Sequence, residues 1–315
     1  MLFGLLVPAY LFCAGVGAGA TFVLAIMGLL VPREEVTALY TRRRDSRSFC
    51  VFKAPKAYRM LFGPPFCAAI ILIAFGMLFL LGDAGTLAAP VLLFSNPTMT
   101  YLSVGSFLLV VGFLLAVFLF ACWGTGGVRV SVRIVRIAHW LMALIGLAIS
   151  AYTGLLLASM PAVPIWSTPW LLVLFVASSL SCGSALVMAS ALINGSASRF
   201  SRSFRRMESI DVAILAVEAI AVAAFLANAF SNPYEAASQG AASLTTGALS
   251  ALFMFGFVGI GLAAPIVLES TLLLQRKHAS QMLLAVSASV LAGGFILRYC
   301  VVTVGSHPEV WTVIS

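Results

Sequence analysis

Eight apolar segments, each long enough to cross a bilayer, constrain this 315-residue chain more than any other feature. A membrane-spanning helix needs ~20 consecutive, mostly apolar residues. The segments that meet this requirement are 5–31, 63–82, 99–122, 134–159, 169–193, 209–230, 246–274 and 281–305. Hydrophobic residues make up 62% of the chain and charged residues only 9%, a balance that excludes an ordinary soluble domain. We therefore predict an all-α, multi-pass membrane protein with eight transmembrane helices, the first of them retained rather than cleaved as a signal peptide.

The basic residues indicate how these helices are oriented. Of the 18 Lys and Arg residues, all except Arg298 fall in or beside the connections that follow the first, third, fifth and seventh segments. The alternate connections, 83–98, 160–168 and 231–245, contain none. The positive-inside rule then places the basic connections in the cytoplasm and both termini outside. The basic run 42–47 could form a nucleic-acid or lipid-headgroup patch, but we interpret it as a topology anchor. As partners of the protein we expect membrane lipid and no nucleic acid.

The cysteines and histidines argue against a redox centre in this chain. None of the six cysteines forms a C-x-x-C pair, whereas an iron–sulfur cluster needs grouped thiolates. A haem held by two histidines needs both at one depth, yet His139 and His307 are expected at opposite membrane faces. We expect no haem, no iron–sulfur cluster and no metal site here, so any electron-transfer centre belongs to a partner.

A weak internal similarity suggests that the chain has two halves. Residues 10–23 resemble 174–187, and residues 146–159 resemble 293–306. The paired segments are offset by four helices, an even number, so both halves have the same orientation. The repeat is therefore parallel, which predicts two four-helix bundles, 1–160 and 161–315. Small residues align in the first pair, Gly15, Gly17 and Gly19 with Ser179, Ser181 and Gly183, and such ladders mark close helix contacts in lipid. Ladders of this kind also occur in membrane helices generally.

The ionisable residues inside the predicted spans all lie in the second half. Asp211 and Glu218 are seven residues apart and share one helix face. Glu269 follows in the next span, and Arg298 and Tyr299 lie in the last. A charged side chain inside a membrane should face the protein interior and have a partner, and Glu218 is the best candidate to pair with Arg298. Two interpretations remain open: a proton path, or an ion pair that holds the bundle together.

The first half instead places uncharged polar groups toward its outer face. These include Tyr10, Asn96, Tyr152 and Thr153. A mostly apolar cavity with a few hydroxyl donors suits the head group of a lipid-soluble quinone. Because Tyr152 lies about two turns inside its helix, it is less typical of the aromatic belt at the membrane surface. We therefore expect these four residues to bind quinone.

Several stretches together resemble the integral membrane subunit of polysulfide reductase and its relatives, the NrfD/PsrC type, which includes the dimethyl-sulfoxide-reductase membrane anchor. They are "YLFCAGVGAGA" (10–20), "AYTGLLLAS" (151–159), "MESIDVAILAVEAI" (207–220), "GIGLAAPIVLE" (259–269) and "GGFILRYCVV" (293–302). The resemblance implies eight core helices in two bundles in the bacterial cytoplasmic (inner) membrane. It also implies a menaquinone or other quinone as substrate, a ferredoxin-like [4Fe–4S] subunit and a molybdopterin oxidoreductase catalytic subunit. Tyr152 matches a position implicated in quinone binding, and Glu218 and Arg298 match positions associated with a proton route. Where some relatives have Asn or His near the outer end of the first helix, this chain has only Tyr10.

The function that follows is a membrane anchor and quinol-binding subunit of a multi-subunit oxidoreductase in anaerobic respiration. It would oxidise (mena)quinol and pass electrons to the iron–sulfur partner, without reducing the terminal substrate itself. One alternative is a secondary transporter with a mid-membrane Glu/Arg site, although such sites usually break their helices and no proline interrupts 209–230 or 281–305. Another is a structural anchor whose quinone site is degenerate.

Overall fold

The structure, a computed structural model, describes residues 5–41, 48–83, 101–125, 130–160, 162–196, 199–275 and 280–305. Within these ranges 8 helices are long and apolar enough to cross a membrane, as predicted. They are α1 (Leu6–Leu30), α2 (Lys56–Asp83), α4 (Tyr101–Phe120) with η2 (Ala121–Thr125), α5 (Val132–Ala158), α6 (Pro169–Ile193), α7 (Ser201–Phe230), η3 (Ala251–Ala263) with α9 (Ala264–Gln275), and α10 (Ser280–Gly305). Both η2 and η3 are π-helical, so the third and seventh spans contain wider turns.

Two helices start earlier than their apolar segments. The second span begins at Lys56 rather than at 63, and the sixth begins at Ser201 rather than at 209. Their first turns carry basic residues such as Arg59 and Arg205. Hydropathy marks only the part of a helix that lies in lipid, whereas backbone hydrogen bonding continues into the aqueous layer.

The connections contain structure that the apolar pattern did not indicate. An antiparallel hairpin joins β1 (Thr37–Thr41) to β2 (Ser48–Phe52), and a short helical turn, η1 (Arg33–Val36), precedes it. The basic run 42–47 lies outside the described residues. Between α7 and η3, helix α8 (Glu235–Thr245) buries a face of small and apolar residues that includes Ala237, Ala241 and Leu244. That face packs on α7, α10 and η3.

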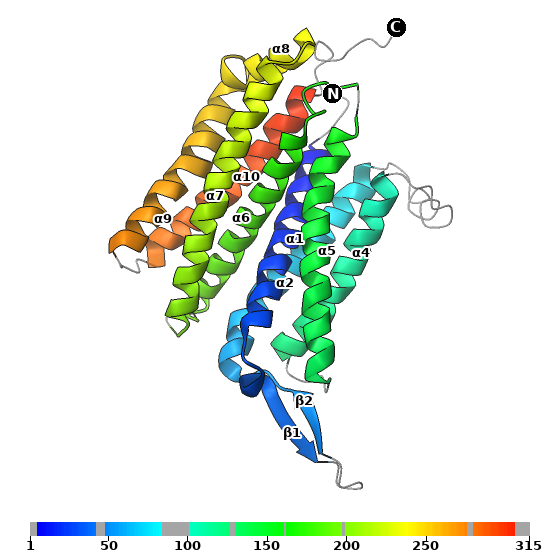
Figure 1. Cartoon of the computed structure of the whole chain (residues 1–315), viewed down its shortest axis with the longest axis vertical. Helices are drawn as coiled ribbons and strands as arrows, with labels where there is room; N and C mark the ends of the chain where they lie inside the picture. The colour runs from blue at the N-terminus through cyan, green and yellow to red at the C-terminus, as the bar shows by residue number, and fades with distance from the viewer. Residues whose placement is uncertain are drawn as a thin grey trace.

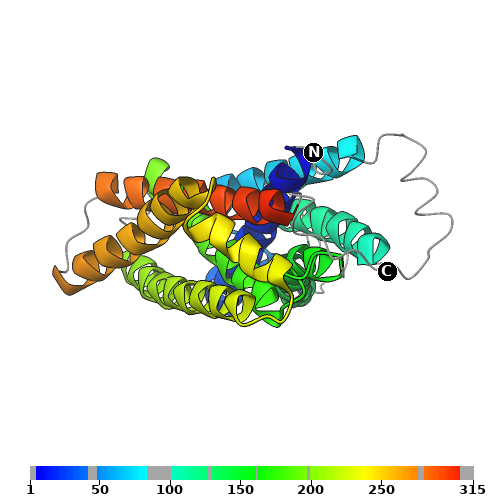
Figure 2. The same ribbon diagram turned by 90° about the horizontal axis from the view of Figure 1, so that it is seen from above.

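The spans form two groups that lie side by side (Figures 1 and 2). Helices α1, α2, α4 and α5 pack together, and α6 and α7 pack with η3, α9 and α10. Between the groups, α6 contacts α1 and α5, and α10 contacts α1. The hairpin marks one end of the molecule and α8 the other, which we call the hairpin end and the α8 end (Figure 1). The parallel repeat itself stays a prediction.

Backbone contact between α1 and α6 explains the small residues of both helices. A Cβ atom added to Gly19 would lie 1.8 Å from the carbonyl oxygen of Ser179. One added to Gly183 would lie 2.2 Å from the carbonyl carbon of Gly19. No side chain fits between these backbones, so the expectation of close helix contact is confirmed where Gly19 and Gly183 meet. Gly17 faces α2 instead, since a Cβ atom there would lie 2.6 Å from the side chain of Ile73.

Candidate functional site

Arg298 lies on α10 and is completely buried between helices. Its Nη2 donates to the Ser179 hydroxyl at 2.9 Å, and its Nη1 donates to the Ser178 hydroxyl at 3.3 Å. Nη1 also donates to the carbonyl oxygen of Gly294 at 2.8 Å. The guanidinium therefore links α10 to α6 through neutral acceptors.

Helix α1 and a further residue of α6, Phe175, supply the rest of the Arg298 environment. The guanidinium carbon lies 5.9 Å from the ring centre of Phe12 and 5.5 Å from that of Phe175, distances at which an aromatic ring attracts a cation. A Cβ atom on Gly15 would lie 2.9 Å from Nη2, so glycine makes room for the arginine at this position. Arg298 thus sits where α1, α6 and α10 meet, at the junction of the two groups.

Glu218 is buried near Arg298 but does not pair with it directly. The Ser181 hydroxyl donates to Glu218 Oε2 at 3.3 Å, and the carboxylate also interacts with the hydroxyl of Ser178. No direct ion pair joins these two described residues, and the pairing that the sequence suggested stays a prediction. Instead Ser178, on α6, lies between an acid from α7 and a base from α10. The two charges attract each other across this hydroxyl.

A second group of buried acids lies toward the start of α7. The Ser184 hydroxyl donates to Asp211 Oδ1, while Asp211 Oδ2 has no partner among the described residues. Glu269 is 1% exposed, and neither of its carboxylate oxygens has a hydrogen-bond partner among the residues that the structure describes. It interacts electrostatically with Asp211 and with Glu208, a third buried acid that sequence reasoning missed.

Four serines of α6 connect these groups, and we call Ser178, Ser179, Ser181 and Ser184 the serine stripe. Sequence reasoning assigned two of them only to helix packing. Ser178, Ser181 and Ser184 recur every three residues, a spacing that keeps them on one side of the helix. This regular spacing of serines in an otherwise apolar span is the sequence signal that could have identified them as partners of the buried charges. Tyr299 does not join the series: it is half-buried against the core and forms no hydrogen bond with another described residue.

The first half brings together two of the four residues predicted to bind quinone. Tyr10 and Tyr152 are 2% and 4% exposed, and their hydroxyls are close enough to interact. Neither hydroxyl has a hydrogen bond of good geometry with a described residue. The ring of Tyr152 also packs against the backbone of α4, since a Cβ atom on Gly105 would lie 1.9 Å from its Cζ.

The other two residues do not complete this pair in the described structure. Thr153 is fully buried, and its hydroxyl donates to the carbonyl oxygen of Ser150 in its own helix at 2.7 Å. The hydroxyl proton of Thr153 is therefore already used in a hydrogen bond to the backbone and is not free for a ligand. Asn96 lies outside the described residues.

His139 is the buried histidine of α5, and both of its ring nitrogens are engaged. Its Nδ1 lies 2.7 Å from the carbonyl oxygen of Val135, and its Nε2 accepts from the Trp123 indole at 3.0 Å. This network makes His139 a packing residue rather than a ligand. The described ranges contain no group of three or more metal-ligating side chains.

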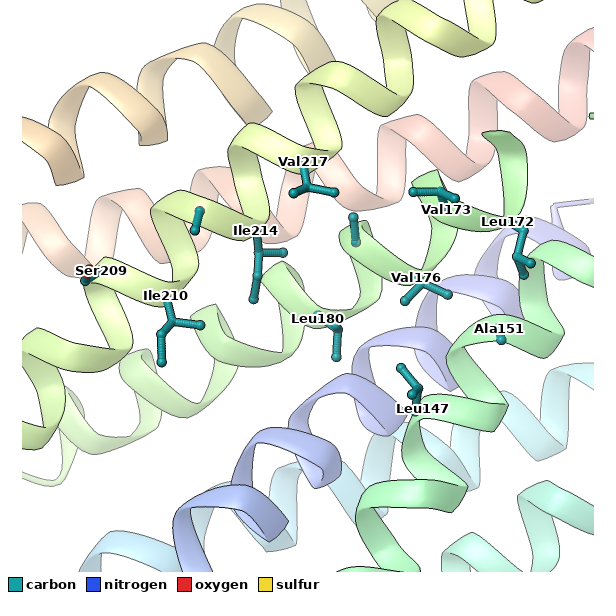
Figure 3. A pocket seen from close by; sticks show the side chains of 12 residues that line it. Leu147, Ala151, Leu172, Val173, Val176, Leu180, Ser209, Ile210, Ile214 and Val217 are labelled. Carbon is teal, nitrogen blue, oxygen red and sulfur yellow. The ribbon is translucent and has the colours of Figure 1, made fainter. Parts of the chain in front are cut away.

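An apolar groove of about 740 Å³ runs along α5, α6 and α7 (Figure 3). Leu147, Val176, Leu180 and Val217 are among its walls, and Ser209 supplies the one hydroxyl among them. None of the predicted site residues lines it. The groove therefore presents a hydrocarbon-like surface rather than a polar site.

Comparisons with known proteins agree with this architecture. A family model described as "Polysulphide reductase, NrfD" matches residues 1–307. The C subunit of polysulfide reductase from Wolinella succinogenes is 31% identical over 161 residues, and "Protein NrfD" of Escherichia coli strain K12 is 25% identical over 165 residues. Each match covers about half of this protein and 51% of the relative's length.

Proposed function

Because this chain belongs to the NrfD family, we propose that it is the quinol-binding membrane anchor of a multi-subunit oxidoreductase. It oxidises (mena)quinol to the quinone, a reaction that releases two electrons and two protons. The electrons pass to an iron–sulfur partner, which feeds a molybdopterin catalytic subunit. The terminal substrate is reduced by that catalytic subunit and not by this chain.

The observation that carries this proposal is the Tyr10–Tyr152 pair. A buried hydroxyl without a hydrogen bond costs ~1–3 kcal/mol. The two hydroxyls here interact with each other, but neither makes a hydrogen bond of good geometry with a described residue. A quinol or quinone oxygen that reached the pair would satisfy both hydroxyls. Its ring and isoprenoid tail would suit the apolar helices around them.

The arrangement of buried charges supports a separate role for the second half. The serine stripe links Asp211 to Glu218 and Glu218 to Arg298, and Glu269 lies beside Asp211. Such a series suits a proton path between the hairpin end and the middle of the membrane. It equally suits a purely structural network, and the effects of Arg298→Leu distinguish the two roles.

We further propose that the hairpin end faces the cytoplasm and that the protein resides in the bacterial inner membrane. Most described basic residues outside the spans, including Arg33, Lys53 and Arg199, lie at this end. The positive-inside rule assigns such an end to the cytoplasm. A reporter fused after Ser315 should then be active only outside. Activity restricted to the cytoplasm would overturn the orientation.

The function is tested by replacing Tyr152 with Phe in the assembled complex. Loss of one hydrogen bond to the quinol should lower its oxidation by about 2–13-fold, the factor that corresponds to ~0.5–1.5 kcal/mol. Tyr234→Phe is the matched control, because Tyr234 is exposed and is not one of the predicted quinone-binding residues. Unchanged quinol-dependent turnover and unchanged affinity for a quinone-site inhibitor in Tyr152→Phe and Tyr10→Phe would contradict the proposal.

A further inference from the structure

The two groups of helices touch in the middle of the membrane but leave a cavity toward the hairpin end. This cavity of about 310 Å³ is bounded by four helices, α1, α2, α6 and α7. Ile26 and Met27 contribute from α1, Phe62 from α2, Leu180 from α6 and Ile210 from α7. It therefore lies between the two groups, beyond the Gly19–Gly183 contact.

The polar groups inside the cavity are already engaged with the protein, except for one. The Tyr58 hydroxyl donates to the carboxylate of Glu35, and the Ser184 hydroxyl is shared with Asp211. Arg206 also lines the cavity, is exposed, and makes no hydrogen bond or ion pair with any other described residue. Arg206 thus places a guanidinium that has no partner among the described residues at the edge of a mostly apolar cavity.

Arg206 lies near the start of α7, where the helix leaves the apolar layer at the basic end of the molecule. A ligand for this place needs an apolar tail to fill the chamber and an anionic group beside the guanidinium. Basic pockets between membrane helices on the cytoplasmic side bind the head groups of anionic lipids.

We propose that this cavity binds one anionic phospholipid, with an acyl chain between the two groups of helices and its phosphate on Arg206. The lipid fills the gap that direct helix packing leaves open. It therefore holds α7 against α1 and α2, elements that come from opposite halves of the chain.

A quinone is less well suited to this cavity, although the groove of Figure 3 shares Leu180, Ile210 and Ile214 with it. The neutral head group of a quinone would leave Arg206 unpaired. It would also compete with hydrogen bonds that Tyr58 and Ser184 already make. The charge at the edge of the cavity thus favours a phosphate over a quinone ring.

The proposal is tested by native mass spectrometry and thermal unfolding of the full chain in detergent. Phosphatidylglycerol and phosphatidylcholine with identical acyl chains are titrated separately, and inorganic phosphate alone is the control for the head group. One equivalent of phosphatidylglycerol should bind and raise the unfolding temperature. Phosphate alone should do neither.

Three variants separate the contributions of the head group and the acyl tail. Arg206→Gln should weaken phosphatidylglycerol binding about fivefold. It should weaken phosphatidylcholine binding less, because the choline ammonium already neutralises the phosphate of that lipid. Arg205→Gln, which removes the same charge from a residue that does not line the cavity, should leave both unchanged. Ile26→Trp should fill the cavity and abolish binding of both lipids. If the Ile26→Trp protein does not fold, Val23→Phe is used as the cavity-filling variant.

Three results would overturn the inference. Equal weakening by Arg205→Gln and Arg206→Gln would mean that the basic end attracts anionic lipid diffusely. Full binding to a folded cavity-filled variant would mean that the acyl tail lies elsewhere. Displacement of the lipid by a quinone, with no dependence on Arg206, would assign the cavity to a quinone instead.

Discussion

The two halves of this protein bury polar groups in different ways. Among the described residues, every buried charged side chain lies in the second half, on α7, α9 or α10. The buried polar groups of the first half are hydroxyls and one histidine, most of them bonded to their own helix. A buried charge is expensive in lipid and needs partners from neighbouring helices, whereas a tyrosine hydroxyl can be left open for a ligand. The second half thus has the more connected interior, and the first half the vacant donors.

The largest expected effect is that of Arg298→Leu. It removes three hydrogen bonds, two of which tie α10 to α6, and leaves the Glu218 charge uncompensated, so the free energy of unfolding should fall by ~3–5 kcal/mol. Adding Glu218→Gln should recover part of this loss. The stability of both variants is measured as folded yield and as unfolding in denaturing detergent. Arg199→Leu, at an exposed position, is the control.

Two outcomes would change this view of the second half. Strictly additive losses in the double variant would mean that Ser178 does not couple Glu218 to Arg298. Normal assembly of Arg298→Leu, together with loss of proton-coupled activity alone, would make Arg298 a proton-path residue rather than a structural one.

Gly19→Ala should have the next largest effect, because its methyl group would overlap the backbone of α6 at Ser179. Overpacking of this kind costs ~1–3 kcal/mol. Gly82→Ala is the control, since its added methyl group would come no closer than 3.7 Å to another side chain. Equal stability of the two variants in thermal unfolding would show that the halves do not depend on this contact.

A smaller loss is expected for Ser178→Ala, which removes the hydroxyl between Glu218 and Arg298. The stability should fall by ~0.5–1.5 kcal/mol, the usual contribution of one hydrogen bond. Ser190→Ala, on the same helix but outside the serine stripe, is the control. If the two substitutions cost the same, the stripe would have no special part in holding the charges.

The smallest expected change in stability is that of Tyr152→Phe, below ~0.5 kcal/mol, because its hydroxyl makes no hydrogen bond of good geometry with a described residue. Its effect should be confined to quinol oxidation. This combination, a stable protein with weakened activity, is the reverse of what Ser178→Ala predicts. A clear loss of stability in Tyr152→Phe would remove the contrast between the halves.

The membrane spans were predictable because length and hydropathy are local properties. The span 169–193 matches α6 at both ends, where Thr168 caps the helix and Pro169 occupies its first turn. Helix α8 was not predicted, since its buried face consists mainly of alanine and glycine and carries little hydropathy signal. The hairpin likewise depends on contacts with distant segments, such as the hydrogen bond from Phe52 to Val130.

The candidate site was predictable in its ionisable residues but not in their partners. Arg298 and Glu218 stand out because charge is rare inside a span. Which atoms they contact depends on how three helices are rotated about their axes, and a single sequence does not encode that locally. The serines were ambiguous for the same reason, because serine in a membrane helix often bonds to its own backbone.

The position of Arg298 also has a consequence for how the protein is made. Its hydrogen-bond acceptors Ser178 and Ser179 lie on α6, which leaves the ribosome before α10. The arginine therefore enters the membrane last, into a protein that already presents hydroxyls and two aromatic rings to receive it. A nascent polypeptide that stops before α10 holds a vacant place for a cation between its two halves. The arrival of α10 at the end of synthesis therefore also closes the contact between the two halves.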